Sequence, residues 1–443
     1  MLRDRQSHII TKIYKSDLGN RFLNGAFWSL LGAISGRGFV LLSFIFVARI
    51  LGQHTYGELG IIRSTINMFT VFAGMGIGAT ASKFISQYRN NEPNRIIDIY
   101  SLSNTISIII GFIGAFSLIV FSPYIADKSL EAPYLTFEIQ LGAIVLLFTT
   151  INGAQSGALS GFEDFKSIAL NTFISGTIQS LLLVLLSYYY GISGCIIALG
   201  FGCIFLSLFN HFSLKKQLTK YNTKHKQTYL LMRISKDMIK ILWSFSLPTV
   251  LSSILVIPVL WWARTFLISK SSFSEMAIFD IADQWSIMVL FIPSTLTQIT
   301  LPLLSNTLSG NKHIQYIKLV KANIILNIAI SFVISAFVIL LRKYILELYG
   351  KEFIDTTPLI FMMISSIMIS GCNVVGQVIA SRGKMWHAFF FNAIWSIWII
   401  LFTLLFVNQN LGASGLAIAI TISYFLHFIA QIIYLKKVLQ FNI

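Results

Sequence analysis

The segment GISGCIIA, Gly191–Ala198, recurs as GASGLAIA, Gly412–Ala419, at an offset of 221 residues and with five identities in eight positions. Two further matches follow nearly the same offset: Asn171 with Asn392, and Ala48-Arg49 with Ala263-Arg264. Each match is short, but their common order and near-constant spacing, at about half of the 443 residues, indicate one unit used twice. The sequence therefore predicts two similar halves.

The composition around these repeats is that of a membrane protein. Apolar residues make up 55% of the chain and charged residues only 11%, with a mean hydropathy of +0.75, whereas a soluble domain carries about 25% charge. These values exclude a water-soluble enzyme, a disulfide-stapled secreted module and a disordered chain, because none of them could hide so much apolar surface.

Twelve apolar runs are long enough to cross a bilayer, which takes about 20 residues of helix. They cover residues 22–50, 58–80, 98–121, 138–159, 168–190 and 192–214, and then 242–268, 277–302, 317–341, 357–380, 386–407 and 412–434. Because six is even, both halves enter the membrane from the same side, as in transporters that bind substrate between parallel repeats. We predict an all-α polytopic membrane protein with about twelve transmembrane helices in two pseudo-symmetric six-helix halves around a central cavity.

The basic residues predict the orientation of this bundle. With both termini in the cytoplasm, 24 of the 33 Lys and Arg residues fall on cytoplasmic segments and only five on external ones, as the positive-inside rule requires. The expected segments are a cytoplasmic N-terminus (1–21), a six-helix bundle (22–214), a basic cytoplasmic loop (215–240), a second six-helix bundle (241–435) and a cytoplasmic C-terminus (436–443). The basic loop anchors the topology and attracts anionic lipid. Nucleic-acid binding is disfavoured, because no soluble basic domain is present.

Four arginines remain inside the predicted spans: Arg37, Arg49, Arg63 and Arg264. A charge at the bilayer centre costs about 2.5–3.5 kcal/mol, so each one is a candidate functional residue. Arg37 lies in the middle of the first run and is expected to line a wet cavity, with helix carbonyls or a buried acid as its alternative partners. Arg49 and Arg264 lie near the outer ends of their spans, where reaching the interface is the alternative.

The repeat aligns a basic residue of the second span with acidic residues in the second half. Asp280 follows Arg63 by 217 residues, and Asp283 lies one turn further on the same helix face. We predict that Arg63 pairs with Asp280 or Asp283 across the halves and closes the outer side of the cavity; ion pairs within one half are the alternative. The two carboxylates are also candidates for coupling transport to H⁺ or Na⁺.

The sequence contains no recognisable catalytic or metal-binding pattern. The seven histidines are scattered singly, the three cysteines lie within apolar runs, and no Gly-rich loop joins a strand to a helix. We therefore expect no enzymatic activity, no cofactor and no metal site.

Several short motifs resemble one transporter family. They are ARILG at 48–52, YG at 56–57, the glycines near the end of the second span, and SGALSG at 156–161. Together with the twelve-span layout, these motifs are similar to those of polysaccharide-biosynthesis flippases of the multidrug/oligosaccharidyl-lipid/polysaccharide exporter superfamily. The resemblance implies an oligosaccharide on polyprenyl pyrophosphate, such as an O-antigen unit, moved by alternating access from the cytoplasmic to the periplasmic leaflet of the bacterial inner membrane.

The resemblance also implies a cationic cavity. Arg37, Arg49 and Arg264 would hold the pyrophosphate through guanidinium contacts, and Arg63 would either join them or stay with the acids. Membrane lipids and other glycan-assembly membrane proteins are the further partners expected. A cation-coupled multidrug exporter and, less favoured, a membrane glycan polymerase are the alternatives. The first would carry more acids than arginines in its cavity, and the second a larger external loop than residues 122–137.

Overall fold

The computed structural model describes residues 17–74, 77–91, 94–220, 247–309, 313–382 and 384–439, and these residues are almost entirely helical. The N-terminal half contains α2 (Asp17–Gly74), α3 (Ile77–Asn91), α4 (Asn94–Tyr124), α5 (Thr136–Gly161) and α6 (Phe165–Thr219), with the short turns η1 (Ile125–Ser129) and η2 (Pro133–Leu135) between α4 and α5. The C-terminal half contains α8 (Leu247–Lys270), α9 (Phe273–Ser309), α10 (His313–Leu340), α11 (Arg342–Tyr349), α12 (Thr357–Ser381), α13 (Met385–Val407) and α14 (Gly412–Leu439).

The longest helices, α2 and α6, each double back on themselves. The backbone of α2 leaves the helical region at Gly52, and beyond it the Tyr56 ring lies 6.5 Å from the Phe44 ring, which a straight helix could not achieve across twelve residues. The backbone of α6 does the same at Gly191. In the described part of the chain, nine helical segments are long and apolar enough to cross a membrane, and both of these reversing helices are among them. Counting each as two spans and adding α8 gives twelve, as the sequence predicted.

The repeated segment marks the same turn in both halves. Gly191 has φ of 57° where α6 reverses, and Gly412 has φ of 51° where α14 begins. Both values lie in the left-handed region, which a residue without Cβ adopts at no steric cost. The recurring sequence thus begins at the glycine that directs the chain into the last span of each half.

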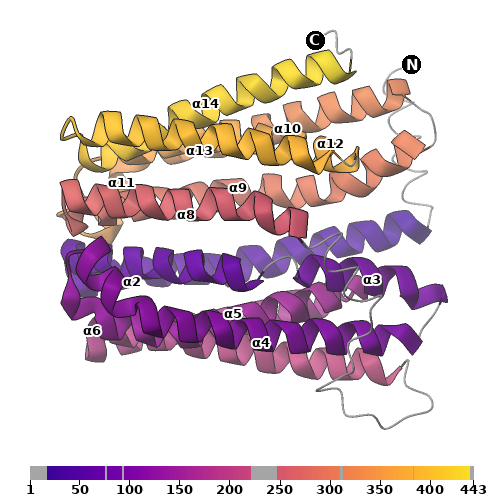
Figure 1. Cartoon of the computed structure of the whole chain (residues 1–443), viewed down its shortest axis with the longest axis horizontal. Coiled ribbons are helices and arrows are strands. Elements are labelled where there is room, and N and C mark those ends of the chain that lie inside the picture. Colours follow the sequence, from indigo (N-terminus) through magenta and orange to yellow (C-terminus); the bar gives the residue numbers. More distant parts are fainter. Residues whose placement is uncertain are drawn as a thin grey trace.

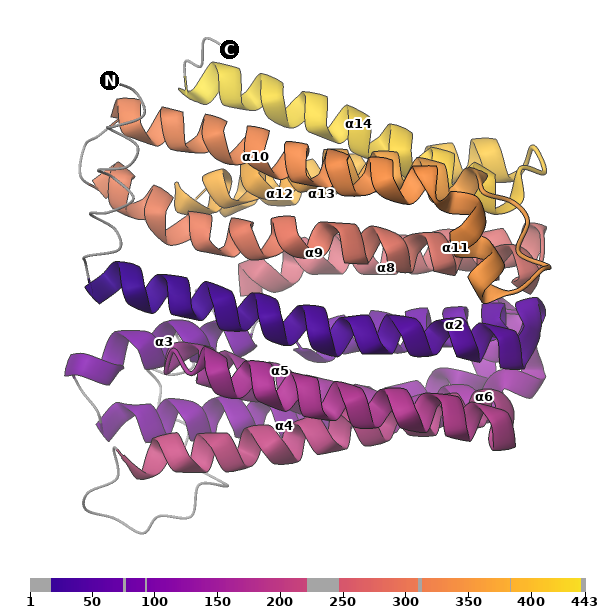
Figure 2. The ribbon, with the colours of Figure 1, turned by 180° about the vertical axis from the view of Figure 1, so that it is seen from behind.

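The two halves lie side by side as separate layers of roughly parallel helices (Figures 1 and 2). α2 begins and α14 ends at one end of the molecule, which we call the termini end. The reversals at Gly52 and Gly191 and the short helix α11 lie at the other, which we call the hairpin end. Of the predicted basic loop 215–240, the first five residues continue α6 to Thr219, and positions 221–240 lie outside the described residues. The division into domains stays a prediction.

Burial differs between the two ends of the molecule. One continuous apolar core joins both halves through residues such as Phe44, Tyr56, Phe279 and Tyr349 near the hairpin end. Nearer the termini end each half has a core of its own, around Tyr100 and Leu214 in the first half and around Tyr316 and Leu435 in the second. Large apolar side chains also point outward, as expected of helices that face lipid.

Candidate functional site

A cavity of about 320 Å³ lies between α2 and α6 of the N-terminal half and α9 of the C-terminal half. Its α6 wall carries the polar side chains of Thr172, Ser175 and Gln179. The α9 wall is mainly apolar, with Ile287, Met288 and Phe291. Among the lining residues, all of them in the described part of the chain, Arg63 of α2 is the one charged side chain. The cavity thus places the Arg63 cation between a polar and an apolar wall.

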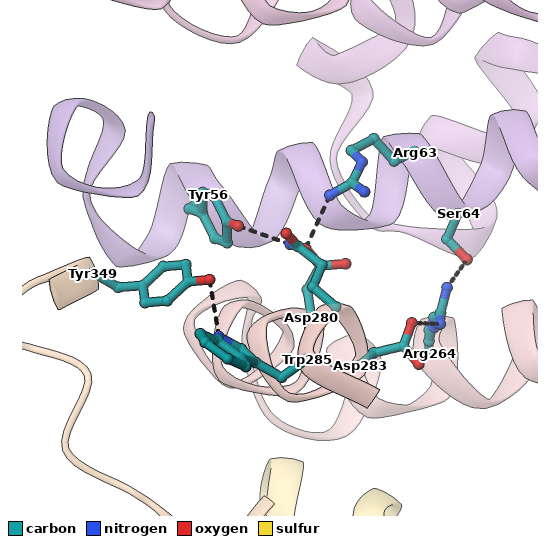
Figure 3. A network of polar contacts seen from close by, with 9 residues as sticks. Tyr56, Arg63, Ser64, Arg264, Asp280, Asp283, Trp285 and Tyr349 are labelled. Carbon is teal, nitrogen blue, oxygen red and sulfur yellow. Dashed lines mark hydrogen bonds and ion pairs between the residues drawn. The ribbon is translucent and has the colours of Figure 1, made fainter. Parts of the chain in front are cut away.

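The Arg63 guanidinium bridges the two halves. Its Nη1 lies 3.3 Å from Oδ2 of Asp280 on α9 (Figure 3). Its central carbon lies 4.2 Å from the centre of the Phe44 ring. The Asp280 side chain is 7% exposed and that of Arg63 is 25% exposed, so the cation reaches the cavity while the carboxylate stays inside the interface. Contact with an aromatic face stabilises a cation without consuming its hydrogen-bond donors. Arg63 therefore keeps donors available to a second anion.

Gln284 completes the surroundings of Asp280. Its Nε2 donates to Oδ2 of Asp280 at 2.6 Å and to the Tyr56 hydroxyl at 2.8 Å, which ties α9 to α2 a second time. The Tyr56 ring packs edge-on against those of Tyr349 and Phe353. The buried carboxylate is thus held by one cation and one amide, as a buried charge requires.

Arg264 and Asp283 form a second pair beside the first. Nη2 of Arg264 on α8 lies 2.7 Å from Oδ2 of Asp283, and Nη1 donates to Ser64 on α2 at 2.8 Å (Figure 3). One turn along α8 from Arg264, Trp261 Nε1 donates to the Thr65 hydroxyl at 2.9 Å. Of the two acids that the sequence offered to Arg63, the structure thus gives it Asp280, while Asp283 is paired within its own half.

Arg49 lies at the hairpin end rather than in the cavity wall. Its Nε donates to the Leu348 carbonyl at 2.5 Å and its Nη2 to the Glu347 carbonyl at 3.2 Å, both in the last turn of α11. A cation there complements the helix dipole and satisfies two carbonyls that lack helical partners. The side chain of Arg37, the fourth predicted arginine, lies outside the described residues. The functional roles of all four arginines and both acids stay predictions.

A further polar contact holds the connection between α4 and α5 against α2. The Tyr134 hydroxyl donates to Glu58, whose carboxylate lies 3.6 Å from Nδ1 of His54. This contact holds η2 against α2 at the hairpin end.

Sequence reasoning missed two features of this region. Gln284 could have been found, because it lies four residues after Asp280 on the same helix face. The short helix α11, which brings Tyr349 against Trp285 and Tyr56, carries no such signal. Within the described residues, no group of three or more His, Cys, Asp or Glu side chains is arranged to hold a metal ion.

Comparison with known proteins identifies relatives of the whole chain. Residues 22–308 match a family model described as "Polysaccharide biosynthesis protein". The EPS I polysaccharide export inner membrane protein EpsE of Ralstonia nicotianae is 23% identical over 408 residues, covering 91% of both chains. A multidrug resistance MATE family transporter of the MOP superfamily in an inward-facing conformation superimposes with a TM-score of 0.76 at 15% identity, over 94% of this chain and 98% of that one. An outward-facing structure gives 0.69 at 15% identity, over 97% of each chain.

Proposed function

Because the chain belongs to the polysaccharide biosynthesis protein family of flippases in the multidrug/oligosaccharidyl-lipid/polysaccharide exporter superfamily, we propose that it carries a lipid-linked oligosaccharide across the bacterial inner membrane. The cargo is an oligosaccharide on polyprenyl pyrophosphate, such as an O-antigen unit. It moves from the cytoplasmic to the periplasmic leaflet, with both termini in the cytoplasm and the hairpin end toward the periplasm. The similarity to the Ralstonia export protein of the inner membrane supports this direction and location.

The observation that carries the proposal is the position of Arg63. A pyrophosphate that leaves water must find fixed donors, and a guanidinium supplies two in parallel with the geometry of phosphate oxygens. Arg63 has one carboxylate partner and faces a cavity between the two halves. The lipid tail can stay in the bilayer while only the polar headgroup enters this cavity.

Substrate binding and closure of the hairpin end compete for the same guanidinium. An anion that takes donors of Arg63 weakens the 3.3 Å pair with Asp280, which then keeps Gln284 alone as the partner of its buried charge. Leaving a buried charge without its partner costs about 3–5 kcal/mol. Separation of the two halves, or uptake of H⁺ or Na⁺ by Asp280 and Asp283, relieves this cost. The anion would thereby loosen the contacts that keep the hairpin end closed.

A cation-coupled drug exporter is the main alternative, because multidrug transporters share the fold. Its cationic substrates would meet an unfavourable field in this cavity, because Arg63 is the one charged residue that lines it in the part of the chain that the structure describes. A membrane glycan polymerase is the second alternative.

Binding of a lipid pyrophosphate tests the proposal directly. The full chain is purified in detergent and titrated with undecaprenyl pyrophosphate or with undecaprenol, which has the same tail without the charge, and retention is measured by native mass spectrometry. We expect at least tenfold tighter binding of the pyrophosphate, and loss of this preference in Arg63→Gln. A tenfold change is about 1.4 kcal/mol, within the range of a hydrogen bond to a charged group.

Arg89→Gln is the matched control for this experiment. Arg89 is also an arginine of the N-terminal half, but it binds Glu163 and the Phe162 carbonyl away from the cavity. It should bind both lipids like the wild type. Equal retention of undecaprenol and undecaprenyl pyrophosphate by the wild type would overturn the proposal.

Charge reversal tests the pairing of Arg63 with Asp280 in cells. In a strain that depends on this chain for polysaccharide export, Arg63→Asp and Asp280→Arg should each abolish export, because each places like charges together at the interface. The double variant restores an opposite pair and should recover part of the export. No recovery, with normal amounts of protein in the membrane, would show that the pair is not a gate.

A further inference from the structure

The α6 wall of the cavity carries a polar stripe that the ion pairs do not use. Thr172, Ser175 and Gln179 follow at spacings of three and four residues and share one face of the helix. The Ser175 hydroxyl donates back to the Asn171 carbonyl of its own helix at 2.7 Å. In the described part of the chain, neither the Thr172 hydroxyl nor the Gln179 amide has a hydrogen-bond partner. Both side chains can therefore bind a molecule in the cavity.

A glycine makes room for the Gln179 side chain. A Cβ added to Gly202, on the returning arm of α6, would meet Oε1 of Gln179 at 2.4 Å and its Cδ at 2.6 Å. The amide thus lies in space left by a missing side chain, with both Gln179 and Gly202 at the cavity wall. Its position is set by the packing of the two arms of α6.

Gln179 lies at about the same depth in the membrane as Arg63. Arg63 comes eleven residues after the reversal at Gly52, and Gln179 twelve residues before the reversal at Gly191. Thr172 lies seven residues further from the hairpin end, about 10 Å at the helical rise of about 1.5 Å per residue. An anion on Arg63 would therefore place the next group of its ligand beside Gln179, and the following one toward Thr172.

The opposite wall completes a two-sided site. Ile287, Met288 and Phe291 of α9 face the stripe with apolar surface. A pyranose ring has the matching chemistry, because its rim carries hydroxyls and its faces carry C–H groups. A purely apolar ligand would leave Gln179 and Thr172 without partners, which costs free energy in a site that excludes water.

We infer that Gln179 is the residue that recognises the sugar joined to the pyrophosphate, with Thr172 binding the next sugar and α9 covering the apolar ring faces. This inference rests on the proposed function, since Arg63 fixes the end of the substrate from which the sugars are counted. It assigns glycan selectivity to the N-terminal half, while the C-terminal half supplies a wall that does not distinguish one hydroxyl pattern from another.

Two lipid probes separate this inference from the proposed function. Binding of undecaprenyl pyrophosphate and of undecaprenyl pyrophosphate N-acetylglucosamine is measured on the purified full chain. The sugar should tighten binding about fivefold to tenfold in the wild type. In Gln179→Leu this gain should vanish, while binding of the sugar-free pyrophosphate stays within twofold. In Gly202→Ala the three nearest atoms to the added Cβ all belong to the Gln179 side chain and none to backbone, so this variant should reduce the gain without unfolding the protein.

Ser180→Ala is the control, because Ser180 neighbours Gln179 but donates to the Gly176 carbonyl of its own helix and does not line the cavity. It should keep the full gain from the sugar. If the wild type ignores undecaprenyl pyrophosphate itself, the proposed function fails. If it binds that lipid but Gln179→Leu and Gly202→Ala keep the full gain, the assignment of Gln179 is wrong.

Discussion

The central helices α2 and α9 run through both the hairpin end and the termini end of the molecule, but among the described residues the two halves are packed together only toward the hairpin end. Toward the hairpin end, one continuous core joins the halves, together with side-chain hydrogen bonds from Arg49, Gln53, Arg63, Trp261, Arg264 and Gln284. Toward the termini end, each half has a separate core, and the cavity lies between the halves. If the chain works as proposed, its state is decided at the hairpin end, because opening there would have to break all of these contacts together.

The closed interface also depends on the absence of side chains. A Cβ added to Gly57 of α2 would lie 1.8 Å from the Phe273 carbonyl oxygen and 2.6 Å from its carbon, at the start of α9. Backbone cannot rotate out of the way as a side chain can, so the two helices would have to separate. Close approach at this point is what brings Arg63 and Asp280 within reach of each other.

The largest expected effect therefore comes from Gly57→Ala. Overpacking costs about 3 kcal/mol at the upper end of its usual range, so the equilibrium constant for closure should fall about 100-fold. Closure is measured as the yield of a short thiol crosslink between Gln53→Cys and Ser274→Cys, positions joined across the halves by a 3.3 Å hydrogen bond. We expect most of this crosslink to disappear, and polysaccharide export with it.

Gly38→Ala is the control for that substitution. Gly38 lies in the same helix, and a Cβ there would meet no other atom within 4 Å. Both substitutions replace a helical glycine by alanine and so gain about 1 kcal/mol of helix propensity, but Gly38→Ala does so without a clash. Its crosslink yield should equal that of the parent. A normal yield in Gly57→Ala would mean that the helices do not need this contact to close.

Much of this comparison was accessible from sequence, and the rest depends on packing. Span length, hydropathy and the repeat predicted twelve crossings in two halves, because bilayer thickness imposes one length on every helix. The repeat offset also brought Arg63 and Asp280 together. The sequence did not decide which base pairs with Asp283. Arg264 reaches it from the neighbouring helix α8, and the rotation of that helix about its own axis is not encoded in any sequence pattern.

The partners of Arg49 could not be predicted from the sequence either. Its place near the end of a span was correct, but its partners are backbone carbonyls of α11, an eight-residue helix in a connection that periodicity cannot reveal. Side-chain patterns predict side-chain pairs, whereas a cation that caps a distant helix depends on where the chain returns. The cavity wall on α6 was likewise hidden among ordinary small and polar residues.

A moderate effect is expected from Arg49→Gln. The substitution removes the charged donors to Leu348 and Glu347, which hold α11 and its buried Tyr349 against α2. Because Arg49 is exposed, we place the loss at about 1.5 kcal/mol, the low end for charged hydrogen bonds, or about tenfold in closure. The Gln53–Ser274 crosslink measures it. Arg342→Gln is the control, since Arg342 donates to the Ile339 carbonyl within its own half and should leave closure unchanged.

The smallest expected effect comes from Thr65→Val, which removes one neutral bridge. The Thr65 hydroxyl accepts from Trp261 Nε1 across the halves and also donates to the Ile61 carbonyl of its own helix. Loss of a neutral hydrogen bond costs about 1 kcal/mol, so closure should weaken about fivefold. Thr70→Val loses the same kind of bond to its own helix, at Ile66, but no bridge is known to depend on it. A crosslink yield lowered equally by both variants would trace the effect to α2 itself, whereas a loss confined to Thr65→Val would show that even single neutral bridges contribute to the closed end.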